Sequence, residues 1–292
     1  MKAKPPSKKV MWGNTITNIH ANVLLGLARY QYLTFSQMLQ LGVGTKHYQY
    51  LWKQVVSLRD RRRPLVKCHN FSTPQPKRGR VESLYFLTAQ GKNALINELN
   101  IHEEFIKKPT SKTVAYKDYH HRKQTIDFRI HLDKWAKEYG YEVPFFDTYF
   151  EKSKHPNGLF YAKTRIDLNN GYIIPDGAFK VANFEIERFY LFELHRGEDS
   201  SRIIQQIHRH AQCLTSRATH GKYNLPLNKA YRVLLLFENE GVKESVLKRI
   251  KKEQAAFKNI QQYFLLKGIN NSSKGEFDKN WITLYSKDTE II

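Results

Sequence analysis

Several features that are common in other protein classes are scarce in this chain, and each scarcity narrows what the protein can be. The 292 residues include only two cysteines, Cys68 and Cys213, too few and too far apart for a disulfide framework or a zinc finger. No apolar run approaches the roughly 20 residues of a membrane span. The first residues are basic and lack the apolar core of a secretory signal. The sequence therefore predicts a reduced, cytoplasmic protein without a membrane partner.

Acidic residues are also scarce relative to basic ones. The chain has 48 Lys and Arg against 27 Asp and Glu, which gives a net charge of +21 and a pI near 9.8. The imbalance is strongest up to Lys108, with 18 basic and 5 acidic residues, whereas the remainder has 30 and 22. Such a basic region suits a polyanionic partner such as nucleic acid. A ribosome-associated or membrane-surface protein can be equally basic, so charge alone indicates a polyanion and nothing finer.

What the chain does contain is enough for a packed core. Hydrophobic residues make up 41% and aromatic residues 13%, and the length fits one large or two ordinary domains. After a basic tail (1–16), threonines at helix-start positions and two strand-like segments around a basic loop predict a winged helix-turn-helix over 17–108. Its predicted elements are helices 17–30, 34–41 and 46–59, strands 65–69 and 83–87, and helix 88–99.

The third predicted helix is the one expected to enter the major groove of DNA. Its predicted buried face consists of Tyr48, Leu51, Val55 and Leu58. The polar residues of this helix, the arginines after it and the basic loop are the expected DNA contacts: Lys46, His47, Gln49, Lys53, Arg61, Arg62, Arg63, Lys77, Arg78 and Arg80. Some winged helices bind proteins instead, but the excess of positive charge favours DNA.

The rest of the chain alternates between the two kinds of periodicity. A polar, basic linker around 101–113 precedes a second domain (109–292) with an α/β pattern and a mixed sheet. Its predicted elements are helix 116–139, strands 141–151, 172–181 and 187–195, helix 200–215, strand 231–237, helix 242–257, strand 262–266 and an edge strand at 281–285.

Two apolar runs in this domain end on an acid, Asp176 in the first and Glu193 in the second. On a strand, Glu193 and His195 share one face, and Asp176 and Lys180 share one face of the neighbouring run. A single acid of this kind is most often an ordinary solvated residue. Two carboxylates on neighbouring strands, however, can hold Mg²⁺ or Mn²⁺ beside a phosphodiester.

We therefore expect Asp176 and Glu193 to be metal ligands. His195 would orient a water, accept its proton or bind the metal. His121, on the preceding helix, would be a further ligand or a proton carrier, although a lone histidine there is more often a surface residue. The pair His208 and His210 has the spacing of a two-histidine relaxase motif, but in a helix their rings diverge. The 17 tyrosines leave a covalent tyrosine step open.

Four short motifs carry a family resemblance: 85–88 (YFLT), 121–122 (HR), 175–176 (PD) and 192–197 (FELHRG). With them the chain resembles, over about residues 17–240, the replication-relaxation family, which includes the C-class plasmid mobilisation relaxases. The resemblance implies a helix-turn-helix joined to a PD-(D/E)XK nuclease-like core that nicks double-stranded origin DNA with Mg²⁺ or Mn²⁺ to start mobilisation or replication. Accessory relaxosome proteins, a coupling protein and a second copy of the chain are the other partners it implies.

One departure from the nuclease pattern matters. His195 stands where these enzymes have a lysine, two residues after the second acid, and Lys180 would have to supply the positive charge from another position. If neither does so, the domain binds DNA without cutting it. A non-catalytic plasmid replication initiator or transcriptional regulator is therefore the alternative, and a basic RNA-binding protein is a second one.

Overall fold

The protein has two compact units. A computed structural model describes residues 16–43, 47–71, 81–107, 109, 114–155, 157–269, 277–285 and 288–291. Unit 1 is Met1–Ile126 and unit 2 is Asp127–Ile292, so the division falls inside helix α6 (Tyr116–Glu138), whereas the sequence placed the domain boundary at 108. In the described ranges, no helix has the length and apolar character needed to cross a membrane.

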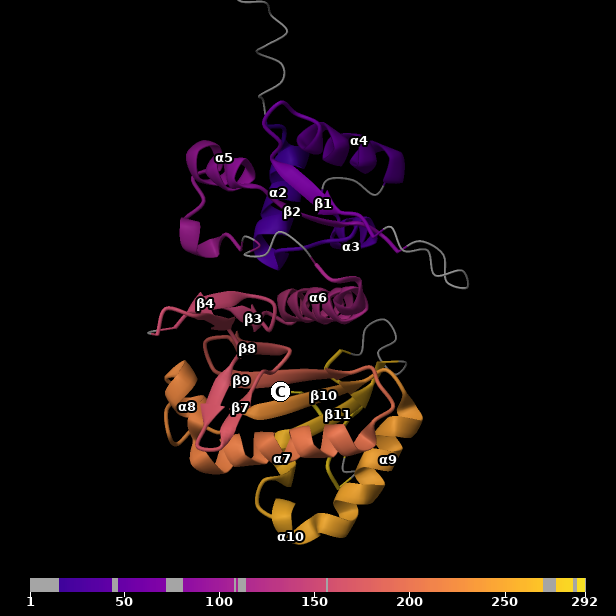
Figure 1. Ribbon diagram of the computed structural model, residues 1–292, viewed down its shortest axis with the longest axis vertical. Helices are drawn as coiled ribbons and strands as arrows, with labels where there is room; N and C mark the ends of the chain where they lie inside the picture. Colours follow the sequence, from indigo (N-terminus) through magenta and orange to yellow (C-terminus); the bar gives the residue numbers. More distant parts are fainter. Residues whose placement is uncertain are drawn as a thin grey trace, which may run out of the picture. The chain divides into compact units, whose positions relative to one another are not determined.

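Unit 1 follows the predicted order of elements (Figure 1). The side chains of Thr17, Thr34 and Thr88 each accept a hydrogen bond from the backbone N–H three residues on, which confirms the three predicted helix caps. Its elements are α2 (Asn18–Tyr30), α3 (Phe35–Leu41), α4 (Tyr48–Arg59), β1 (Val66–His69), β2 (Leu84–Leu87), α5 (Ala89–Leu99) and the short η1 (Glu103–Phe105).

Helix α4 differs from its prediction at its start. It begins at Tyr48 with His47 as N-cap, two residues later than expected. Leu51, Val55 and Leu58 are buried as predicted, but Tyr48 is 59% exposed, so its assignment to the buried face is wrong. The first residue of a helix overhangs the end of the packed face, so helical spacing alone does not bury it.

The β1–β2 hairpin of unit 1 gains a third short partner. Leu33, between α2 and α3, exchanges two backbone hydrogen bonds with Tyr85 of β2, at 3.1 and 2.8 Å. Helix α5 then approaches the hairpin closely at Gly91, where a Cβ atom would lie 2.1 Å from the carbonyl oxygen of Leu65. A side chain does not fit there, so glycine allows the helix and the hairpin to touch.

Unit 2 is built on a mixed sheet with the strand order β13-β12-β11-β10-β9-β8-β3. Strands β9, β10 and β11 are parallel to one another, and the other neighbours pair antiparallel. The strands are β3 (Phe146–Thr148), β8 (Gly177–Ala182), β9 (Glu187–His195), β10 (Arg232–Phe237), β11 (Phe264–Gly268), β12 (Trp281–Thr283) and β13 (Asp288–Thr289).

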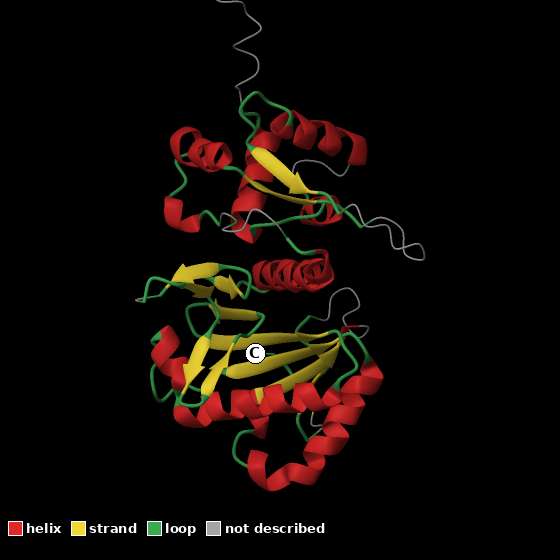
Figure 2. Cartoon of the chain, in the orientation of Figure 1, coloured by secondary structure: helices red, strands yellow, loops and turns green. Residues whose placement is uncertain are grey.

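Helices cover both faces of this sheet (Figure 2). The alternation along β9 divides its residues: Leu191 faces a core with Ile207 of α7 (Ser200–Ser216), whereas Phe192 faces Phe128 of α6, with ring centroids 3.9 Å apart. Helix α9 (Glu240–Ile250) packs on the α7 side. Strand β10 is buried on both faces, as its unbroken apolar run predicts.

The region between β3 and β8 differs most from the prediction. The expected strand 141–151 is reduced to the three residues of β3, and two hairpins follow it. They are β4 (Lys152–Lys154) with β5 (Phe160–Ala162), and β6 (Ile166–Leu168) with β7 (Gly171–Ile173). The expected strand 172–181 is split into β7 and β8 around Pro175, which lacks the N–H that a continuous ladder needs.

The remaining helices differ in detail. The side chain of Asp199, rather than Ser200 or Ser201, caps α7. A helix that was not predicted, α8 (Ala218–Tyr223), follows α7. The predicted helix 242–257 is divided into α9, η2 (Lys251–Glu253) and α10 (Gln254–Phe257), and η3 (Gln261–Tyr263) precedes β11.

Candidate functional site

Asp176 and Glu193 meet at the end of β8 and β9. The antiparallel register pairs Gly177 with Phe192, and its continuation by one residue places Asp176 opposite Glu193. Asp176 Oδ2 accepts a hydrogen bond of 2.7 Å from the backbone N–H of Leu194. This bond attaches the half-exposed Asp176 carboxylate to strand β9. Asp176 directly follows Pro175, which interrupts the strand before β8.

Glu193 is enclosed by helix α7. Its side chain is buried, with Oε1 2.6 Å from His210 Nε2 and Oε2 accepting a 2.8 Å hydrogen bond from Gln206 Nε2. Gln206 and His210 are four residues apart and therefore lie on one face of the helix. We call Asp176, Glu193, His195, Gln206 and His210 the Glu193 cluster.

Burial controls protonation in this cluster. Desolvation raises the pKa of Glu193 well above its usual range, and the charge of nearby Asp176 raises it further. Desolvation, together with the nearby His195, lowers the pKa of His210 to about 3. Burial therefore favours the neutral forms of both Glu193 and His210. The other ring nitrogen of His210, Nδ1, is buried and makes no hydrogen bond to the described residues.

His195 lies two residues beyond Glu193 on the same strand face. It is buried, its ring centroid is 4.9 Å from that of Phe237, and it contributes to the lowered pKa of His210. The structure thus brings Asp176, Glu193 and His195 together, three of the residues that the sequence predicted for the site.

The other two predicted residues have other described contacts. Lys180 forms an ion pair with Glu187, at 3.2 Å. It is four residues from Asp176 along β8, roughly 13 Å at the usual rise of a strand, so it does not reach the Glu193 cluster. His121 is a half-buried residue of α6 and belongs to unit 1; its carbonyl accepts a 3.0 Å hydrogen bond from the Thr125 hydroxyl.

Sequence reasoning missed Gln206 and His210. The available signal was that His210 occupies a position of the buried stripe of α7, seven residues after Ile203. A histidine in such a stripe needs an internal hydrogen-bond partner. The expected divergence of the two histidines is confirmed, since His208 Nε2 lies 2.7 Å from Glu253 whereas His210 contacts Glu193.

A second pair of acids, also missed, lies on the same face of the sheet. Asp147 of β3 is opposite Ala178 in the register and is buried. Lys163 Nζ is 2.7 Å from Asp147 and 3.9 Å from Glu151. Lys163 therefore balances part of the negative charge of Asp147 and Glu151. Burial, with Asp147 and Glu151 nearby, raises the pKa of Tyr223.

Whether a divalent metal ion fits the Glu193 cluster depends on Asp176 and Glu193, the two carboxylates that lie opposite each other. Within the described ranges, no three His, Cys, Asp or Glu side chains form a group that could hold a metal ion. Mg²⁺ commonly uses only one or two protein carboxylates, with water and substrate phosphate completing its shell. Asp176 and Glu193 could supply those carboxylates, and burial, reinforced by the charge of Asp176, raises the pKa of Glu193. Glu193 would have to lose its proton for such an ion to bind.

The predicted DNA-contacting residues that the structure describes lie at or near the surface of unit 1. His47, Gln49, Lys53, Arg62 and Arg63 are exposed, and Arg61 is half-buried. Helix α4 also exposes three aromatic side chains, Tyr48, Tyr50 and Trp52. The other predicted contacts lie outside the described residues: Lys46, Lys77, Arg78 and Arg80.

No family model, curated protein or solved structure matches this chain. The case for a function therefore rests on the geometry of the Glu193 cluster and the exposed face of α4.

Proposed function

We propose that the protein is a metal-dependent DNA nickase of the relaxase kind, which nicks the origin DNA of a plasmid or other mobile element. The observation that carries this proposal is Asp176 opposite Glu193, on the second and third strands of the order α6–β3–β8–β9–α7–β10. In that order β3, β8 and β9 are antiparallel, and β10 is parallel to β9. Nucleases of the PD-(D/E)XK type carry their acids on the corresponding strands.

The arrangement of unit 1 supports a winged helix-turn-helix as the DNA-reading part. Helix α2, the Leu33 bridge, α3, α4, the β1–β2 hairpin and α5 follow one another in that order. Helix α4 is the second helix of the turn and has an exposed polar face, which suits insertion into the major groove.

The chemistry expected at unit 2 is cleavage of a phosphodiester. A divalent ion at the two carboxylates would neutralise the phosphate and activate a water. Asp176, held by the Leu194 N–H, is the half-exposed carboxylate that would face it. Glu193 Oε1 lies 2.6 Å from His210 Nε2, so a proton on Glu193 could pass to the imidazole when positive charge arrives nearby.

A nicking assay tests the proposal. Supercoiled plasmid with the cognate origin is incubated with the full-length protein and Mg²⁺ or Mn²⁺, with and without chelator. We expect nicking that the chelator abolishes and that Asp176→Ala or Glu193→Ala reduces by at least about 100-fold. Glu187→Ala is the matched control, since it removes a carboxylate from the exposed end of the same strand. Unimpaired nicking by both cluster variants would refute the assigned site.

The alternative is a non-catalytic initiator or transcriptional regulator. It is favoured by the saturation of both Glu193 oxygens by α7 and by a histidine in place of the expected lysine. In that case the wild type binds origin DNA but never nicks it with either metal, and Asp176→Ala binds that DNA as tightly as the wild type. Gel-shift and nicking measurements on the same samples distinguish the two functions.

A further inference from the structure

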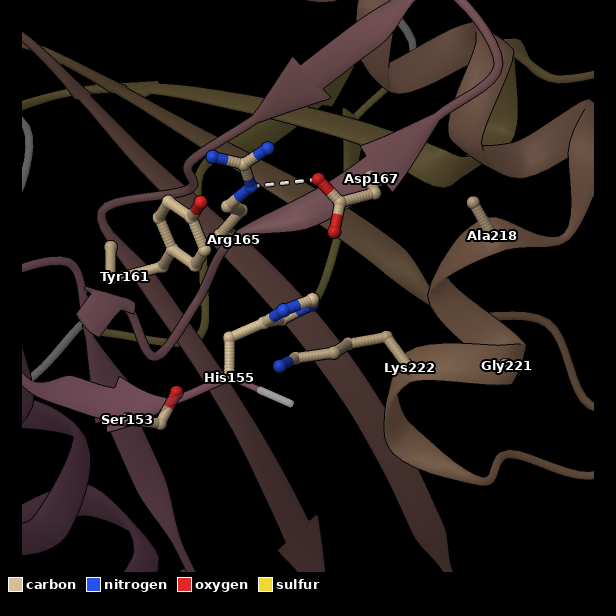
Figure 3. A pocket seen from close by; sticks show the side chains of 9 residues that line it. Ser153, His155, Tyr161, Arg165, Asp167, Ala218, Gly221 and Lys222 are labelled. Atoms are coloured by element: carbon tan, nitrogen blue, oxygen red, sulfur yellow. Dashed lines mark hydrogen bonds and ion pairs between the residues drawn. The ribbon is translucent and has the colours of Figure 1, made fainter. Parts of the chain in front are cut away.

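Unit 2 contains a polar pocket of about 280 Å³ between the inserted hairpins and α8 (Figure 3). Its polar lining comes from Ser153, His155, Tyr161, Arg165, Asp167 and Lys222. The first five belong to the segment between β3 and β8, and Lys222 reaches toward His155 from α8. None of these residues belongs to the Glu193 cluster.

Arg165 is held rigidly at the wall of the pocket. Its guanidinium carbon lies 4.3 Å from the ring centroid of Tyr161 and 4.0 Å from that of Tyr172. Its Nε–H donates to Asp167 Oδ1 at 2.7 Å. The two terminal nitrogens make no hydrogen bond to the described residues, so four of the five N–H donors remain for a ligand. A stacked, preoriented guanidinium is well suited to a phosphate group.

The opposite wall adds positive charge without a compensating acid. Lys222 is exposed and forms no ion pair with the described part of the chain. The side chain of His155 likewise makes no hydrogen bond there, and its ring meets Tyr161 edge-on with centroids 5.4 Å apart. Asp167 is the one acid of the lining and is paired with Arg165. The pocket therefore favours an anion.

We propose that this pocket binds one nucleotide unit through its phosphate group. Lys222 and His155 would hold the phosphate, with Arg165 on the opposite wall. The second oxygen of Asp167 and the Ser153 hydroxyl would accept hydrogen bonds from the sugar or base. The volume lies at the small end of the range for ligand pockets, which suits a single unit.

A buried hydrogen bond links the pocket to the Glu193 cluster. Thr164 is fully buried, and its Oγ1 donates to the carbonyl oxygen of Pro175 at 2.6 Å. Arg165 directly follows Thr164 and Asp176 directly follows Pro175, and consecutive Cα atoms are only about 3.8 Å apart. A DNA strand with one nucleotide in the pocket would thus pass close to Asp176. In this respect the proposal rests on the proposed function, but a free nucleotide offers the same phosphate chemistry.

The test measures binding to the full-length protein in the presence of chelator, by fluorescence anisotropy of a labelled four-residue oligothymidylate and by competition with thymidine 5′-monophosphate. We expect Lys222→Ala and His155→Ala each to weaken oligonucleotide binding by about 10-fold or more, as for loss of a charged hydrogen bond. Lys222→Arg should restore most of it. Lys154→Ala is the matched control, because it removes a lysine from the same hairpin outside the pocket lining, and should change binding less than about twofold.

The competition arm identifies the source of the nucleotide. Displacement of the oligonucleotide by the mononucleotide supports a pocket for free nucleotides, and a Lys222-dependent oligonucleotide affinity without displacement supports a nucleotide within a strand. Unchanged affinity in both Lys222→Ala and His155→Ala, with unaltered circular dichroism melting curves, overturns the proposal. If either alanine variant has an altered melting curve, Lys222→Arg decides instead, and its failure to retain most of the wild-type affinity would also overturn the proposal. Since no metal is present, pocket binding can persist even if plasmid nicking is never observed.

Discussion

The shared proton of Glu193 and His210 predicts an unusual dependence of stability on pH. In the unfolded chain, Glu193 titrates near its ordinary value of 4.5 and His210 near 6.5. Between these values the unfolded pair holds one proton, on the histidine. Burial favours the protonated form of Glu193 and the neutral form of His210, so the folded pair also holds one proton until the pH reaches the raised pKa of Glu193. Between pH 4.5 and 6.5, and below that pKa, the pair therefore adds no pH dependence to the free energy of unfolding.

Outside that interval the signs are opposite. The raised pKa of Glu193 means that its contribution to stability is lost as the pH rises above 6.5 towards that pKa, because the folded state then holds a proton that the unfolded state has released. The lowered pKa of His210 means that stability is lost as the pH falls from 4.5 towards about 3, because the unfolded state then binds one proton more. Each pH unit in either direction costs about 1.4 kcal/mol.

The variant Glu193→Gln separates the two contributions. It leaves a buried neutral His210 without its acidic partner, so the unfolded chain gains a proton below pH 6.5 that the folded chain does not. We expect the variant to lose about 3 kcal/mol between pH 6.5 and 4.5 relative to the wild type over the same two pH units. Above pH 6.5 the variant should lack the decline that the wild type shows.

Urea unfolding followed by circular dichroism at pH 4.5, 6.5 and 7.5, with chelator present, measures these differences. Titrations of all other groups are common to both proteins and cancel in the comparison. Glu187→Gln, at the exposed end of the same strand, is the control and should follow the wild type. Parallel stability curves for Glu193→Gln and the wild type would refute the shared proton.

Three further predictions concern other parts of the molecule. Gly91→Ala should lower the free energy of unfolding of unit 1 by about 3 kcal/mol, since its Cβ meets the Leu65 carbonyl oxygen; an unchanged melting temperature would contradict this. Phe192→Ala should cost about 3–5 kcal/mol in urea unfolding, because it removes a buried ring stacked on Phe128, whereas the 99% exposed Phe184 should tolerate alanine. Calorimetric titration should show Mg²⁺ binding more tightly at pH 8 than at pH 6, with proton release, as the raised pKa of Glu193 must be overcome; equal affinity at both pH values would argue against Glu193 as a ligand.

The elements that the sequence predicted well are those whose residues repeat with a clear period. Strand β9 was predicted with its observed bounds, 187–195, because apolar residues fill both of its faces up to Glu193. The helix caps at Thr17, Thr34 and Thr88 were equally readable, because a cap is a local hydrogen bond between a side chain and the backbone three residues on. Local signals of this kind do not depend on the rest of the fold.

The inserted hairpins could not be predicted in the same way. Strand β4 consists of Lys152, Ser153 and Lys154 and has no apolar face. Strands of three residues are too short to show a period. Their pairing depends on partners such as β5 and β6 and on the Thr164–Pro175 hydrogen bond, none of which is visible in the local sequence. The pocket that they form was missed for the same reason.

The sequence predicts the position of the candidate site better than it predicts the protonation of its residues. The meeting of Asp176 and Glu193 follows from the period of two strands and a short antiparallel connection. The protonation of Glu193 follows from Gln206 and His210, which reach it from the next helix. Helical periodicity marks His210 as buried, but only the packing of α7 on the sheet identifies its partner.

The choice between a nickase and a DNA-binding protein then becomes a question about one positive charge. Two neighbouring carboxylates cannot both ionise cheaply in a buried setting, so one of them takes up a proton or a cation. Lys163 partly meets this need for Asp147 and Glu151, and Lys180 pairs with Glu187, whereas burial favours a proton on Glu193. If Mg²⁺ displaces that proton at physiological pH, the pair is equipped for phosphodiester cleavage. If the proton persists at millimolar Mg²⁺, Glu193 and His210 are a neutral structural pair, and DNA binding through α4 of unit 1 is the function that remains.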